Sequence, residues 1–154
     1  MRVLIIEDNT FNAFCLRRML ESVVASVSVT VVDNSQDALS VIALNMPDLV
    51  IMDGELKLIN EWSRHGPQLA AILLEKYPHL PVIAWTDSEF MREAFVKVFM
   101  RHNLLIKDHT VWAKVISPER IRTTMSYYFG TNQNRELPHA THLNAPRPNS
   151  HLYQ

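Results

Sequence analysis

The sequence predicts one doubly wound α/β domain, in which a five-stranded parallel sheet is covered by helices on both faces. Short, almost continuous apolar runs alternate with longer amphipathic stretches along residues 1–129, as strands buried on both faces require. The chain has 154 residues, of which 47% are hydrophobic and 20% charged, so it can form one core and is not disordered throughout.

Five apolar runs are expected to form the sheet. Residues 3–6, 49–52 and 81–85 are predicted to be buried strands because nearly every side chain in them is apolar. Residues 27–31 alternate between apolar and polar side chains, which predicts a half-covered strand nearer an edge of the sheet. The short run 111–113 is the weaker fifth strand.

Five helices are expected between and after these strands. Apolar side chains at helical spacing predict the first two helices, over residues 14–23 and 38–44. The other three begin at start signals with a proline or a capping side chain, namely Gly66-Pro67, Asp87-Ser88 and Ser117-Pro118.

Charge and cysteine content exclude several classes of function. The 15 basic residues nearly balance the 16 acidic ones, so no chain-wide positive field attracts nucleic acid, and no direct DNA binding is expected. The one cysteine, Cys15, cannot form an internal disulfide, and its apolar helix predicts a buried, unreactive thiol. No run is long enough to cross a bilayer and no signal peptide is evident, so a cytoplasmic protein without membrane contact is expected.

The composition changes near the C-terminus. Residues 130–154 are rich in Asn, Pro and His and have almost no apolar periodicity, which predicts a disordered tail. We therefore expect the folded domain to span residues 1–129, with no attached output module.

Polar side chains follow four of the five predicted strands. Glu7 and Asp8 follow the first strand, Asp53 the third, Thr86 the fourth and Lys114 the fifth. Because ligands bind beyond the carboxyl ends of parallel strands, these side chains are expected to meet at one edge of the sheet.

Three carboxylates at one site repel one another unless a cation neutralises them. Their oxygen ligands suit Mg²⁺, and the ammonium group of Lys114 adds a second positive charge. Asp53 follows the middle strand and is therefore the expected nucleophile toward phosphorus, while the Thr86 hydroxyl can donate to a phosphoryl oxygen. The residues thus predict a phosphorylatable aspartate.

Three segments resemble a known family. Residues 3–9, together with Asn12 and Leu16, resemble the opening of a response regulator receiver domain. Residues 48–53 resemble its phosphoacceptor strand and residues 81–86 its fourth strand. The resemblance extends over residues 1 to 128 and implies the flavodoxin-like, CheY-like receiver fold.

The resemblance implies a role for each site residue. Asp53 would be the phosphoacceptor, Thr86 the switch hydroxyl and Lys114 the phosphate-contacting ammonium. The implied Mg²⁺ ligands are the carboxylates of Glu7, Asp8 and Asp53 and the main-chain carbonyl of Glu55.

The resemblance also implies partners rather than a dedicated enzyme activity. A histidine kinase or a histidine phosphotransfer protein would donate the phosphoryl group in a two-component phosphorelay. A downstream protein target would read the result. The fourth helix, fifth strand and fifth helix would form a surface that also supports a homodimer.

The second half of the chain departs from the family pattern. The loop after Asp53 lacks the usual Met-Pro turn and is longer, Asp87 replaces a small residue after Thr86, and Val115 replaces a proline after Lys114. Lys107 is an alternative site lysine, with residues 103–106 as an alternative fifth strand.

These departures leave two other functions open. The first is a receiver-like adaptor that binds partners independently of phosphorylation. The second is a Mg²⁺-dependent phosphatase, in which Asp53 would be the nucleophile and Glu55 the acid catalyst.

Overall fold

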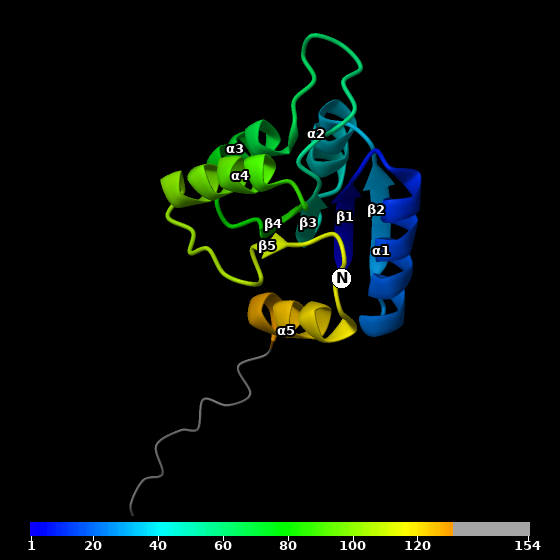
Figure 1. The fold of residues 1–154 in the computed structure, drawn as a ribbon. Helices are drawn as coiled ribbons and strands as arrows, with labels where there is room; N and C mark the ends of the chain where they lie inside the picture. The colour runs from blue at the N-terminus through cyan, green and yellow to red at the C-terminus, as the bar shows by residue number, and fades with distance from the viewer. Residues whose placement is uncertain (131–154) are drawn as a thin grey trace, which may run out of the picture.

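The structure, a computed structural model, describes residues 1–130 of the chain. Residues 131–154, where the sequence predicts most of the tail, lie outside the described residues. Five strands alternate with five helices along the described part (Figure 1). In chain order these are β1 (Arg2–Ile6), α1 (Thr10–Val23), β2 (Ser28–Val32), α2 (Ser35–Leu44), β3 (Leu49–Met52), α3 (Gly66–Lys76), β4 (Val82–Trp85), α4 (Glu89–Arg101), β5 (Val111–Trp112) and α5 (Pro118–Phe129).

The strands form one parallel sheet in the order β2-β1-β3-β4-β5, which confirms the predicted fold class. β2 pairs with β1 alone and, of its five residues, only Val29 is buried, as its alternating sequence predicts for an edge strand. β5 is only two residues long and pairs with β4.

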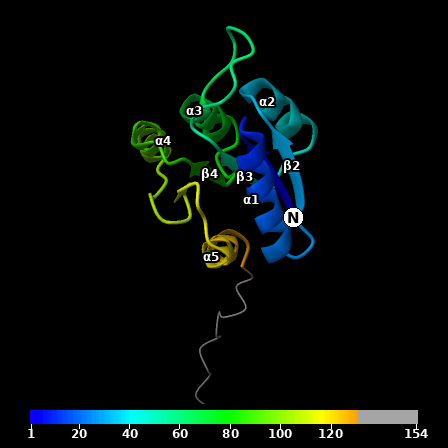
Figure 2. The same cartoon turned by 45° about the vertical axis from the view of Figure 1, so that its right-hand side comes forward.

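Helices cover both faces of the sheet, because successive side chains of each buried strand point to opposite sides. In β1, Val3 and Ile5 pack in a core that includes residues of α1 and α5. Leu4 and Ile6 pack in a second core with residues of α2, α3 and α4. Figures 1 and 2 show this division of the helices. Each fully buried leucine or isoleucine contributes about 2 kcal/mol to folding.

Helix starts follow the predicted capping signals. The Ser88 side chain accepts a hydrogen bond from the Met91 N–H at the start of α4, and the Ser117 side chain accepts from the Arg120 N–H at the start of α5. Pro118 occupies the first turn of α5. These caps fix where α4 and α5 leave the ends of β4 and β5.

The prediction for Cys15 is wrong, because its thiol is exposed. The buried stripe of α1 consists of Ala13, Leu16 and Leu20, which lie three and four residues apart. Cys15 and Phe14 fall outside this stripe, and Phe14 is also exposed. Within residues 1–130, no helix combines the length and the hydropathy that are needed to span a bilayer.

The alternative fifth strand is also wrong. Residues 103–106 form no strand, and Asn103 has a φ of 59°, the left-handed conformation that ends a helix. The chain reaches β5 only after a turn in which the Lys107 N–H donates to the Thr110 hydroxyl oxygen at 2.9 Å. Lys107 therefore precedes β5 rather than following it.

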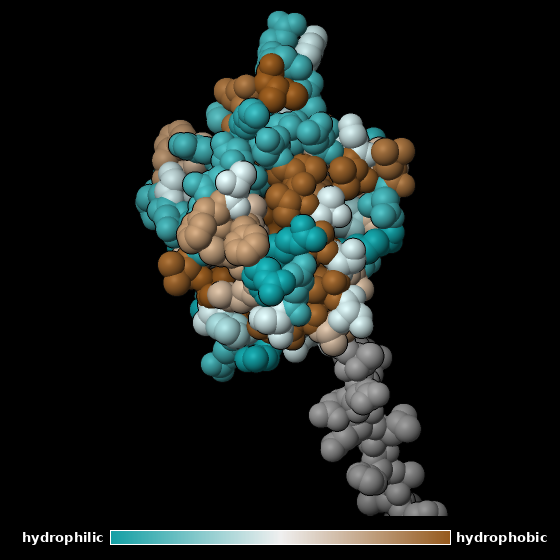
Figure 3. Space-filling view, turned by 90° about the vertical axis from the view of Figure 1, so that its right-hand side faces the viewer, coloured by the Kyte–Doolittle hydropathy of each residue, from teal (hydrophilic) through white to brown (hydrophobic). Residues whose placement is uncertain are grey.

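The segment between β3 and α3 projects beyond the carboxyl edge of the sheet (Figure 1). Its tip is closed by the Ser63 hydroxyl oxygen, which accepts from the N–H groups of Ile59 and Asn60 at 2.9 and 3.1 Å. Leu58 and Ile59 are exposed there, and Figure 3 shows apolar surface on the projecting part. The unusual length of this loop in the sequence thus becomes a structured projection.

Candidate functional site

The predicted acidic residues meet at the carboxyl edge of the sheet. β1 and β3 are neighbours with Ile6 opposite Met52, so Glu7 and Asp53 leave the sheet side by side. The Asp53 N–H donates to the Ile6 carbonyl oxygen at 2.9 Å. Carboxylate oxygens of Glu7, Asp8 and Asp53 all lie within 4.8 Å of one another.

The three carboxylates differ in exposure. The Glu7 side chain is 1% exposed and that of Asp53 13%, whereas Asp8 is exposed. The oxygen ligands therefore range from buried to exposed, and the site is open to solvent on one side. This arrangement fits Mg²⁺, which binds few protein carboxylates and retains several waters. Of the fourth expected ligand, Glu55, the side chain is exposed and lies at the start of the projecting loop.

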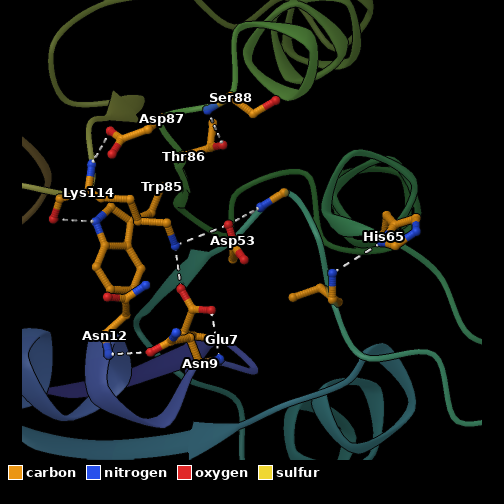
Figure 4. Close-up of polar contacts among 12 residues, drawn as sticks. Glu7, Asn9, Asn12, Asp53, His65, Trp85, Thr86, Asp87, Ser88 and Lys114 are labelled. Carbon is orange, nitrogen blue, oxygen red and sulfur yellow. Dashed lines mark hydrogen bonds and ion pairs between the residues drawn. The ribbon is translucent and has the colours of Figure 1, made fainter.

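Lys114 contacts two of the three acids. Its ammonium group lies 3.1 Å from Asp53 Oδ1 and donates a hydrogen bond to Glu7 Oε2 (Figure 4). Its side chain is 18% exposed. Lys107 is exposed and, among the described residues, forms no ion pair with these acids. The geometry therefore brings Lys114, and not Lys107, to Asp53.

Two neighbours hold Lys114 at both its backbone and its ammonium group. The Asp87 carboxylate accepts the Lys114 N–H at 2.8 Å, and the Trp85 indole N–H donates to the Lys114 carbonyl oxygen at 3.3 Å. The ammonium group lies 3.9 Å from the centroid of the Trp85 ring, within cation–π range. Figure 4 shows the lysine side chain running along this ring toward the acids.

Burial and charge oppose each other at Glu7. Burial raises the pKa of Glu7 above its ordinary value, while the hydrogen bond from Lys114 lowers it, and the nearby Asp53 adds to the increase. The ionised form of Glu7 therefore depends on a cation beside it. Lys114 supplies that charge in this structure.

Thr86 lies at the end of β4, and its side chain contacts the start of α4. Its N–H donates to the Trp112 carbonyl oxygen at 2.9 Å, and its hydroxyl oxygen accepts from the Ser88 N–H at 3.1 Å. Thr86 is 7% exposed. Its recorded bonds within residues 1–130 use the hydroxyl only as an acceptor, so its proton is available to a ligand.

Gly66 allows the projecting loop to return to the site. Its N–H donates to the Gly54 carbonyl oxygen at 2.8 Å. A Cβ at position 66 would collide with the carbonyl oxygen of Asp53 and would lie 2.6 Å from the Phe95 ring. The first residue of α3 therefore has no room for a side chain beside Asp53.

Trp85 is a further site residue that the apolar pattern of its strand does not reveal. Its position in an apolar run predicts a core residue, and it is indeed 2% exposed. Only its place directly before Thr86 and its indole N–H, a polar group that needs a partner when buried, could have indicated a second role. Asp87, which the sequence marks as a departure from the family pattern, is also the hydrogen-bond acceptor of the Lys114 N–H.

A comparison with known protein families matches the part of the chain that carries Glu7, Asp8, Asp53 and Thr86. A sequence model of the response regulator receiver domain matches residues 3–111. A comparison with curated proteins gave no match.

Solved receiver domains have the same fold. The signal receiver domain of an HD domain-containing protein from Pseudomonas fluorescens Pf-5 superposes with a TM-score of 0.68 at 16% identity, covering 82% of this chain and 85% of that chain. The receiver domain of a modulated diguanylate cyclase from Desulfovibrio desulfuricans G20 gives 0.66 at 27% identity, over 82% and 91% of the two chains. The NtrX receiver domain from Brucella abortus gives 0.66 at 19% identity, over 84% and 98%.

The family match covers more than half of the chain, from β1 to the start of β5, and includes the strand ends that carry the three acids and Thr86. The chain belongs to the response regulator receiver domain family of two-component signalling proteins.

Proposed function

We propose that this receiver accepts a phosphoryl group on Asp53 from a histidine kinase or a histidine phosphotransfer protein, and that it signals through protein–protein interaction. The observation that carries the proposal is the clustering of the Glu7, Asp8 and Asp53 oxygens within 4.8 Å, with the Lys114 ammonium 3.1 Å from Asp53. A nucleophilic carboxylate beside concentrated positive charge is what phosphoryl transfer requires.

In the proposed step, a carboxylate oxygen of Asp53 attacks the phosphorus of a protonated phosphohistidine. The new O–P bond forms as the P–N bond breaks, and the electron pair returns to the ring nitrogen, which leaves a neutral imidazole. Glu7, Asp8, Asp53 and the Glu55 carbonyl would hold Mg²⁺, which supplies charge neutralisation at the phosphoryl oxygens when bound. Lys114 can transfer its contact from the Asp53 carboxylate to the new phosphoryl group.

Thr86 is the proposed sensor of phosphorylation. Its hydroxyl proton can donate to a phosphoryl oxygen, while its oxygen already accepts from Ser88, the N-cap of α4. A shift of this hydroxyl would therefore be passed to the first turn of α4. We propose that α4, β5 and α5 form the surface that changes, with a downstream target or a second copy as the partner.

A small phosphodonor, such as acetyl phosphate, with Mg²⁺ tests the proposal. The wild-type chain should gain one phosphoryl group, measured by intact mass, and Asp53→Asn should gain none. Asp108→Asn is the matched control, because Asp108 is exposed and remote in the sequence from the acid cluster. Equal labelling of wild type and Asp53→Asn would refute the proposal.

A second candidate, a receiver-like adaptor that needs no phosphorylation, is favoured by one observation. Lys114 contacts both Glu7 and Asp53, so the chain itself balances part of the negative charge of the acid cluster. Beryllofluoride with Mg²⁺ distinguishes the two candidates. Amide shifts around Thr86 support phosphoryl control, and no change there supports the adaptor.

We further propose that the receiver unit spans residues 1–129 and lies in the cytoplasm. It would bind neither DNA nor a membrane directly. The net charge of −1 supports the absence of DNA binding by this chain.

A further inference from the structure

The surface between α3 and α4 contains a groove that the proposed phosphoryl chemistry does not use. It has a volume of about 390 Å³ and lies between α3 and the face of α4 that carries Phe90, Ala94, Lys97 and Arg101. These four residues are spaced four, three and four apart, so they share one face of the helix. α3 and α4 are packed side by side (Figures 1 and 2).

The groove has an apolar floor. Pro67 and Ala71 of α3 and Met91 and Val98 of α4 line it, and Met91 and Val98 are each 8% exposed. Phe90 is 76% exposed beside this floor. An exposed aromatic ring beside an apolar depression provides apolar surface that a binding partner can bury.

The charge of the groove is positive. Lys97 and Arg101 line it and are both exposed, and none of its lining residues is acidic. Within residues 1–130, neither cation forms an ion pair with a carboxylate. The groove therefore combines apolar contact area with two unpaired positive charges.

The positive charge of the groove indicates which occupant fits it best: the C-terminal residues of this chain, a second copy, or a segment of another protein. The C-terminal residues of the chain, 131–154, contain two arginines and one glutamate, so they carry the same sign of charge as the groove. A second copy would place the same Lys97 and Arg101 opposite each other if the contact were two-fold symmetric. A partner segment with acidic and apolar side chains matches both features.

We propose that the groove between α3 and α4 binds an acidic peptide segment of a partner protein. Apolar side chains of the segment pack on Phe90 and Met91, and its carboxylates pair with Lys97 and Arg101. This groove lies on the side of α4 that faces α3, whereas the signalling surface proposed above combines α4 with β5 and α5.

A peptide-display selection on the full chain tests the proposal directly. A library of random peptides is selected on wild-type protein and then depleted of peptides that also bind Phe90→Ser. The retained peptides should be acidic and should contain aromatic or aliphatic residues. Retained peptides that are basic or uncharged, or a selection that retains nothing, would overturn the proposal.

A retained acidic peptide is then titrated against variants. Lys97→Glu should weaken binding about tenfold, because a reversed charge opposes the carboxylates of the peptide. Arg122→Glu, a reversal at an exposed residue of α5, is the charge-matched control and should leave binding unchanged. Equal weakening by both variants would show that only net charge matters and would overturn the assignment of this groove.

Amide shifts locate the peptide, and sedimentation measures self-association. Shifts confined to α3 and α4 support the proposal. Shifts confined to α5, or a dimer that Phe90→Ser abolishes, overturn it in favour of another surface or a second copy. Because the titration can be repeated on Asp53→Asn, failure of phosphorylation and failure of docking are scored separately.

Discussion

The Lys114 ammonium group lies 3.9 Å from the centroid of the Trp85 ring, while the indole N–H of the same tryptophan donates to the Lys114 carbonyl oxygen at 3.3 Å. The Trp85 side chain thus contacts both the ammonium group and the backbone carbonyl of Lys114. In this chain Val115 follows the lysine where the family usually has proline. Trp85 therefore provides part of the orientation of Lys114 toward Asp53.

Replacing Trp85 with phenylalanine should weaken this arrangement without removing the ring. The lost hydrogen bond leaves the Lys114 carbonyl without its indole donor and should lower the free energy of unfolding by about 1 kcal/mol. Urea unfolding measures the change, and the rate of labelling by acetyl phosphate with Mg²⁺ should fall in parallel. An unchanged labelling rate would mean that the lysine is oriented by other contacts.

Asp87→Ala should slow phosphorylation of Asp53 about tenfold, because it removes the acceptor of the Lys114 N–H and lets the lysine move from its position. Asp87→Asn is the matched control, because it keeps an acceptor oxygen and removes only the charge. The asparagine variant should label at least as fast as wild type. Faster labelling of the alanine variant would instead show that repulsion of the incoming phosphoryl group is the main effect of Asp87.

Lys114→Met should destabilise the fold by about 3 kcal/mol in the absence of Mg²⁺, because it leaves the buried Glu7 carboxylate without its cation. Added Mg²⁺ should then raise the unfolding temperature of the variant more than that of wild type. Thermal unfolding with and without the ion measures both effects. An equal response to Mg²⁺ in the two proteins would contradict the proposed charge compensation.

Gly66→Ala should cost about 2 kcal/mol of stability, because the added methyl group collides with the Asp53 carbonyl oxygen and forces the backbone to move. Urea unfolding tests this expectation, with Glu75→Ala as a control at an exposed residue of the same helix that forms no recorded side-chain hydrogen bond or ion pair within residues 1–130. The alanine at position 66 should also reduce labelling of Asp53. A stable Gly66→Ala variant would show that the loop can return by another path.

His109 should give the protein an acid-sensitive component of stability. The His109 ring is stacked on the Tyr127 ring, with 3.5 Å between the ring centroids. Burial and the nearby charge of Lys107 lower the pKa of His109 below its ordinary value. The pKa of His109 is lower in the folded chain than in the unfolded chain, so the unfolded chain binds more protons between these two values. The free energy of unfolding therefore falls as the pH drops below about 6.5, the pKa of an unperturbed histidine. The free energy of unfolding of His109→Gln should depend less on pH across this window, and an identical slope would contradict the prediction.

Much of the fold could be predicted from local patterns. The apolar runs and the capping serines, Ser88 and Ser117, depend on neighbouring residues only, and the observed elements follow them closely. The convergence of Glu7, Asp8, Asp53 and Lys114 was also predictable, because parallel strands carry the residues after them to one edge of the sheet.

The wrong and missing predictions depend on contacts between distant segments. Whether Cys15 is buried depends on which face of α1 meets the sheet, and a helix of mixed apolar residues does not fix that rotation. The role of Trp85 depends on the position of Lys114, 29 residues away in the chain. The nearby sequence shows that the Trp85 indole N–H needs a partner when buried, but it does not identify Lys114 as that partner.

The hydrogen bond between the Gly66 N–H and the Gly54 carbonyl closes the projecting segment at its base. Its two ends therefore meet at one point, whatever the length of chain between them. Such a segment can gain, lose or exchange residues during evolution while Asp53 keeps its surroundings. An epitope or fluorophore inserted between Asn60 and Glu61 would open the turn at the tip of the segment and leave the hydrogen bond at its base in place.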